Sequence, residues 1–400
     1  MLTRKQNLLC TLLVCFAAST TLAQASLAEF QQLLREKASF EERDVAALEL
    51  NQPVVRLVPP SNKREVAVTG LVNINASAED FLRSYRDSML QKSNAAILQI
   101  GRFGPEPALA DIAGLSLEAK DIEDLKECVA GACQVKLSAP MIERFRKEID
   151  WAAPDYQLRA TNLFKEMLVA YIKDYRAHGE AALIEYSDKR DRVSLATEQR
   201  ELSSAGGYIN SVLADTKSGL QLIEETLVWS KIKFGLKPVI AVNHISIYKR
   251  DSGVGPQVLV ASKQIYANHY FNAFHALTAF VNVPGATYLV YENRSRADGL
   301  EGPFGKIKRG VVEKKALEGL RGIIAQSKAS LESPTLTAAT AEFSAHSSEG
   351  WGHRLFGGIR PLLWLLVLSA IIALLVLGRR RADSATAAKG KALKPESVKS

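Results

Sequence analysis

Residues Ser262–Phe280 read SKQIYANHYFNAFHALTAF, a stretch that places two histidines among several tyrosines and phenylalanines. If the stretch is extended, successive side chains alternate between the two faces of a sheet. One face then carries His269, Phe271, His275 and Leu277, and the other carries Tyr266, Tyr270, Phe274 and Phe280. In a helix the two imidazoles would point about 240° apart, because each residue turns by about 100°. Only the extended form therefore brings both histidines to one side.

Four short apolar runs between Val239 and Asn293 include this stretch. They read VIAVNHISIY, QVLVASKQIYA, AFHALTAFVNV and ATYLVYEN, and Gly, Pro or Asn residues separate them. Connections this short predict an antiparallel meander, because parallel strands need crossovers of about a dozen residues or more. A long helix is predicted next, over Gly305–Glu332. We therefore expect an α+β fold in which an antiparallel sheet packs on a long C-terminal helix.

The chain before the meander holds both strand and helix signals. EVAVTGLVNIN alternates apolar with less apolar residues, as a half-buried strand does, and Ser77 then opens a short helix. AILQIGRF (96–103) and CQVKL (133–137) are predicted as further strands. LRATNLFKEMLVAYIKDYRAHG carries one apolar stripe and stops at Gly179, which indicates an amphipathic helix. We extend the helical prediction to about Lys233, so that a helical insertion covers about 141–233.

The two ends of the chain carry targeting signals. Residues 1–25 run from a basic start through a short apolar core to an A-x-A motif, the pattern of a secretory signal peptide. Residues 361–378, PLLWLLVLSAIIALLVLG, contain no charge and are followed by three arginines. This pattern predicts a single transmembrane helix whose C-terminal side stays in the cytoplasm.

These signals divide the chain into segments. We predict an α+β ectodomain over 26–332, a flexible stalk over 333–360 and a basic cytoplasmic tail over 379–400. The ectodomain is expected on the extracytoplasmic side, which is the periplasm in a bacterium.

The net charge is concentrated at the ends of the chain. The whole sequence carries +8, of which residues 1–25 contribute +2 and residues 379–400 contribute +5, leaving +1 for everything between. A nearly neutral domain is a poor ligand for a polyanion, so no nucleic-acid partner is expected. The basic tail is expected to contact anionic lipid headgroups.

Two cysteines remain once the signal peptide is removed. Cys128 and Cys133 stand in CVAGAC, and an even pair in an oxidising compartment predicts a local disulfide. A zinc site would need further ligands at matched spacing, and the sequence offers no second C-x-x-C or histidine pair nearby.

The histidines allow a catalytic alternative. In an extended chain His269 and His275 could meet His244 of the preceding strand and Glu292 of the following one, as a three-histidine metal site would require. The usual i, i+2 or i, i+4 histidine pair is missing, and nothing marks out a nucleophile for a hydrolase. We therefore predict no catalytic residue, no metal and no cofactor.

The aromatic residues favour a ligand-binding wall. Apolar rings with a few polar groups are typical of ligand pockets and equally of ordinary cores, and both interpretations stay open. Arg294, in ENRSRAD, would hold an anionic headgroup or belong to a charged turn. The candidate ligand-binding residues are Tyr266, Tyr270, Phe271, Phe274, His275, Phe280 and Arg294.

The order of elements resembles the START-like (SRPBCC) helix-grip superfamily. EVAVTGLVNIN enters SAEDFLRSYRD, and the meander precedes GPFGKIKRGVVEKKALEGLRGIIAQSKASLE, so the resemblance covers about half of the mature chain in two pieces. It implies a curved sheet around the last helix, with a lipid or other hydrophobic ligand between them. We expect a membrane-anchored protein that binds such a ligand without catalysis. The alternatives are a scaffold whose 141–233 region binds a protein partner and, third, a hydrolase.

Overall fold

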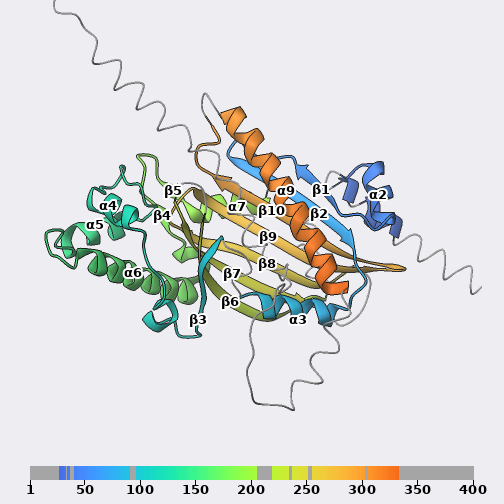
Figure 1. The fold of residues 1–400 in the computed structure, drawn as a ribbon, viewed down its shortest axis with the longest axis horizontal. Helices are drawn as coiled ribbons and strands as arrows, with labels where there is room; N and C mark the ends of the chain where they lie inside the picture. The colour runs from blue at the N-terminus through green and yellow to red at the C-terminus, as the bar shows by residue number, and fades with distance from the viewer. Residues whose placement is uncertain are drawn as a thin grey trace, which may run out of the picture.

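Figure 1 shows the computed structural model, which describes residues 27–332 except 33, 37–39, 91–95, 205–218, 234–236, 251–254 and 302–304. Its centre is an eight-stranded sheet with the order β1-β2-β10-β9-β8-β7-β6-β3. All seven strand pairs of this sheet are antiparallel. The predicted α+β class with a large antiparallel sheet is thus confirmed.

The meander forms the middle of the sheet, as predicted. Its four predicted strands are β7 (Val239–Lys249), β8 (Gly255–Ala267), β9 (Phe271–Val283) and β10 (Ala286–Ala297), and β6 (Gln221–Ile232) extends the meander by a strand that was not predicted. The flanking strands are β1 (Val54–Val58), β2 (Glu65–Asn73) and β3 (Ile97–Phe103). β2 pairs with β10, and β3 closes the other side by pairing with β6.

Three secondary-structure predictions are wrong. Within the predicted helical insertion, β4 (Glu185–Tyr186) and β5 (Val193–Ser194) form a two-stranded sheet. Residues 221–232, predicted as helix, form β6; Leu227 and Trp229 pack on one face of the sheet and Val228 on the other. Residues 227–232 of β6 are buried on both faces, so this half lacks a period-two alternation and its sequence resembles a buried helix. The segment 133–137, predicted as a strand, lies outside the strands, because its backbone bonds to turns: Lys136 N donates to Asn268 O (2.8 Å).

One face of the sheet is covered by α9 (Gly305–Glu332), which runs diagonally across it in Figure 1. The stripe of α9 that faces the sheet consists of Val312, Ala316, Leu320, Ile323 and Ile324. β2 approaches closely at Gly70, where a Cβ would collide with Ile324 Cδ1. Beside α9 lies α3 (Ala78–Ser88), which begins at the predicted cap Ser77. The ring of Phe81 on α3 stacks on Phe280 at 5.6 Å.

The other face is covered by separate pieces. At one end lie α4 (Ala119–Lys126), α5 (Ala139–Glu148), α6 (Tyr156–His178), η2 (Gly179–Ala182) and α7 (Leu195–Ser204). At the other end Phe30 and Leu34 of the N-terminal helical segment pack on the sheet with Leu48 of α2 (Glu42–Glu49). The apolar stripe predicted for α6 is buried, and the helix ends at Gly179, where φ is +59°.

Cys128 and Cys133 form the predicted disulfide. The loop between them turns at Gly131, whose φ of +87° suits a residue without a side chain.

The predicted signal peptide, stalk, membrane helix and tail lie outside the described residues. Among the helices that the structure describes, none combines the length and apolar character needed to cross a bilayer.

Candidate functional site

The stretch Ser262–Phe280 is a hairpin rather than one strand. β8 ends at Ala267 and β9 begins at Phe271, so His269 lies in the turn between them. Tyr270 completes the turn with φ of +60°. The prediction that His269 and His275 share one face of a continuous strand is therefore wrong, because the turn interrupts the alternation.

His269 links the turn of the β8–β9 hairpin to helix α4. Its buried Nε2 lies 3.0 Å from Oδ1 of Asp121 on α4, and Lys237 Nζ lies 3.1 Å from the same oxygen. Burial alone would raise the pKa of Asp121, but the hydrogen bond with His269 and the charge of Lys237 outweigh it and lower this pKa. The Nε2 atom of His269 is thus engaged by a structural carboxylate.

The candidate aromatic residues are divided between the two faces. Phe271, Phe274 and Phe280 belong to the core beneath α9 and α3. Tyr266 lies on the other face because a β-bulge in the β7–β8 pairing shifts the register; its hydroxyl donates to Lys136 O (3.1 Å). Tyr270 accepts a hydrogen bond from Lys237 N (3.1 Å). These residues do not line one common cavity.

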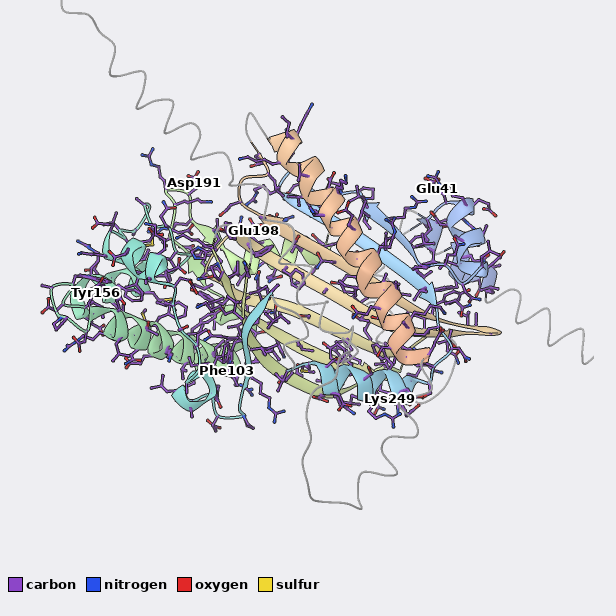
Figure 2. The ribbon with its side chains drawn as sticks, in the orientation of Figure 1. Glu41, Phe103, Tyr156, Asp191, Glu198 and Lys249 are labelled. Carbon is purple, nitrogen blue, oxygen red and sulfur yellow. A yellow bond between two sulfur atoms is a disulfide. The ribbon has the colours of Figure 1, made fainter. Side chains whose placement is uncertain are left out.

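Arg294 lies in β10, so its placement in a charged turn is wrong. The side chain is buried: its Nη1 donates to Glu65 Oε1 (2.6 Å) and its Nε to Glu292 Oε1 (2.8 Å). The neighbouring Arg296 donates to Glu198 on α7 (3.1 Å), which Figure 2 labels. These groups form a buried ion network between β2, β10 and α7, and the guanidinium of Arg294 is occupied by protein carboxylates.

His275 lines a pocket of 330 Å³ on the face of the sheet opposite α9. His244 on β7 is the register partner of Lys263 on β8, and Lys263 is the register partner of His275 on β9. Cross-strand partners point to the same face, so these three side chains form one row. α6, η2 and α7 cover the row with Tyr175, Glu180 and Ser203 respectively.

Hydrogen bonds order one side of this pocket. His244 Nε2 lies 3.2 Å from Glu225 Oε1, and its Nδ1 lies 2.9 Å from the Tyr175 hydroxyl. The carboxylate accepts from Nε2–H, so Nδ1 accepts the Tyr175 proton. Burial lowers the pKa of His244, although the charge of Glu225 acts to raise it. Burial also raises the pKa of Tyr175.

His275 has one engaged nitrogen. Its Nδ1 lies 3.4 Å from Ser203 Oγ, while Nε2 is buried and has no hydrogen-bond partner among the described residues. Burial, followed by the charge of Lys263, lowers the pKa of His275 to about 4. The imidazole is therefore neutral at physiological pH and presents one donor and one acceptor.

The rest of the pocket wall is largely apolar, with Tyr248, Ala261 and Leu277 from three strands. An apolar wall with a few convergent polar groups is able to hold a small molecule that has one polar end. Of the predicted ligand-binding residues, only His275 lies here. Sequence reasoning missed Tyr175, Glu180 and Lys263, because they come from three elements and meet only through strand register and helix docking.

A second hollow of 590 Å³ lies at the tip of the β9–β10 hairpin. It is lined by Asn73–Asn75 and Asn282–Thr287, which include no charged side chain. Its turn residues supply no convergent charged group, so we favour the smaller pocket.

The three histidines do not converge, since His269 is bound to Asp121 and is absent from the pocket lining. Across the part of the chain that the structure describes, no three His, Cys, Asp or Glu side chains gather in a way that would hold a metal ion.

Comparisons of the chain with models of protein families, with curated proteins and with solved structures found no significant match.

Proposed function

We propose that this protein binds a hydrophobic or lipid-like molecule without transforming it, in the pocket that contains Lys263 and His275. The observation that carries the proposal is the 330 Å³ pocket itself, in which apolar strand residues meet a few polar groups. Its volume lies at the lower end of the ~300–1,000 Å³ typical of ligand pockets.

The pocket is not where the helix-grip resemblance would place it. Phe274 and Phe280 fill the space beneath α9 and α3 with buried side chains, whereas the pocket lies on the opposite face. We propose membership of that superfamily on the basis of the sheet and the last helix alone.

We also propose that the domain lies outside the cytoplasm, anchored by residues 361–378. The signal-peptide pattern and the apolar segment support this placement, and the disulfide suits an oxidising compartment. A ligand pocket held close to a membrane has direct access to amphiphilic molecules.

Hydrolysis is less well supported. Ser203 and His275 are 3.4 Å apart, but the described residues place no carboxylate on the other nitrogen of His275 to orient it as a base. A scaffold role is supported by exposed apolar side chains in the 141–233 region, namely Leu158 on α6 and the adjacent Leu222 and Ile223 on β6. Exposed apolar side chains in such small numbers are common on protein surfaces, so the pocket is the stronger observation.

The test is native mass spectrometry of the full-length protein released from lipid nanodiscs. Ala261→Phe should fill the pocket and abolish any co-purified mass, while the control Ala325→Phe, at an exposed position of α9, should retain it. If neither the unmodified protein nor the control carries or takes up an apolar mass after incubation with membrane extract, the proposal is wrong.

A further inference from the structure

We infer that the pocket selects ligands with an anionic head, and that Glu180 is an internal stand-in for that head, bound to Lys263 until a ligand displaces it. This inference rests on the proposed function and adds the chemical class of the ligand.

Lys263 is the cation around which the pocket is built. Its side chain is 24% exposed, and its Nζ lies 2.8 Å from Glu180 Oε1 and 6.0 Å from the centre of the Tyr175 ring. Burial opposes the charged form, yet the hydrogen bond to Glu180 and the proximity of Tyr175 outweigh it and raise the pKa of Lys263. A charged ammonium that is largely buried needs an anionic partner.

Glu180 is suited to be replaced. It lies in η2, a four-residue turn that begins where α6 ends at Gly179, and its side chain is 72% exposed. An ion pair that is so exposed on one side contributes little to stability. Glu180 can therefore move into water at small cost when the anionic head of a ligand takes its place, whereas Lys263 stays fixed in the middle strand of the row.

A second group is available for the head. Glu225 is already bonded to His244, so it does not compete for Lys263 as Glu180 does. The register neighbour of Lys263 is His275, whose Nε2 is buried without a hydrogen-bond partner in the described structure. In the tautomer in which Ser203 donates to Nδ1, the imidazole proton lies on Nε2 and this nitrogen is a donor. An acid group in the pocket would pair with Lys263, and it would also accept from His275 if the atoms that cover the buried Nε2 move aside.

The volume limits the size of the ligand. At ~30 Å³ for each water-sized group, 330 Å³ holds on the order of ten non-hydrogen atoms. Octanoate is a carboxylate of this size, and octyl phosphate is the corresponding phosphate. The two probes share the anionic head and distinguish a fatty acid from a phosphorylated amphiphile.

The test is calorimetric titration of the full-length protein in nanodiscs, with empty nanodiscs as the blank. Octanoate or octyl phosphate should bind, and octanol and octylammonium should bind at least about tenfold more weakly, since a hydrogen bond between charged groups is lost. Lys263→Met should weaken anion binding about tenfold or more, and Glu180→Gln should strengthen it several-fold. The control Lys314→Met, on the exposed side of α9, should change neither.

Three results would overturn the inference in different ways. Equal binding of octanol and octanoate, unchanged in Lys263→Met, would refute the anionic head but keep the pocket. Weaker anion binding in Glu180→Gln, with an unfolding midpoint equal to that of the unmodified protein, would show that Glu180 positions Lys263 instead of competing with the ligand. If no probe binds and native mass spectrometry finds no ligand, the proposed function fails as well.

Discussion

The two faces of the central sheet are covered in different ways. One face lies under α9 and α3, whose side chains join the strands in one aliphatic and aromatic core. The other face is covered by α6, α7 and the N-terminal helical segment, which belong to two separate apolar clusters. Between those clusters lie the pocket and the buried ion network. The face under α9 and α3 has one continuous apolar cluster, whereas the face under several short elements has two clusters, with polar groups and a pocket between them.

The largest expected effect concerns the ion network. Arg294→Leu removes a cation from between the buried carboxylates of Glu65 and Glu292. We expect the free energy of unfolding to fall by about 3–5 kcal/mol, because removing one partner leaves buried charge uncompensated. The measurement is urea unfolding of the full-length protein in nanodiscs, followed by tryptophan fluorescence. A loss below about 1 kcal/mol, similar to that of the exposed Lys314→Met, would show that water reaches this network.

The same enlargement should destabilise the protein on one face of the sheet and change its stability little on the other. Ala316→Phe inserts a ring between α9 and the sheet, where the side chain is fully buried, and should cost about 1–3 kcal/mol or more of unfolding free energy. Ala261→Phe directs its ring into the pocket and should change that energy by no more than about 0.5 kcal/mol. Equal losses in the two variants would mean that both faces are packed alike.

Substitutions at two glycines test how closely α9 packs on the sheet. Gly70→Ala places a Cβ against Ile324 and should destabilise the fold by about 1–3 kcal/mol. Gly310→Ala lies on the exposed side of α9 with open space around it, and should stabilise the fold by about 0.5–1 kcal/mol. Thermal unfolding of both variants beside the unmodified protein measures the difference. A neutral Gly70→Ala would indicate that α9 shifts easily over β2.

The smallest expected effect is a pH dependence at His275. Its pKa is lowered from 6.5 to about 4 by burial and the charge of Lys263, while Glu180 acts in the opposite direction. The unfolded chain therefore binds more protons in this window, and stability falls as the pH drops from about 6.5 towards 4. We expect a loss of roughly half a kcal/mol between about pH 7 and pH 6.

His275→Gln should remove this contribution, so the difference in unfolding free energy between the two proteins should be constant above about pH 7 and should change below it. Because other titrating groups are common to both proteins, they largely cancel in the difference. A difference that is flat down to about pH 4 would contradict the buried, neutral state of His275.

Local sequence patterns predicted the elements whose signal lies in neighbouring residues. The short, Gly- or Pro-marked connections predicted the antiparallel meander, the stripe of α6 followed the helical period, and Ser77 marked the start of α3. The disulfide between Cys128 and Cys133 was predictable from CVAGAC, because both cysteines lie within one short loop. β6 was not predicted as a strand, because the burial of residues 227–232 on both faces removes the alternation that marks a strand.

The candidate site depended on contacts that no local pattern contains. Sequence alone determined that His275 lies in a strand near aromatic residues, since that follows from alternation and composition. Tertiary structure decided that a turn takes His269 to Asp121, and that strand register aligns His244, Lys263 and His275 beneath α6 and α7. The physical reason is that hydrophobic period is a property of adjacent residues, whereas strand register and helix docking are set by side chains distant in the chain.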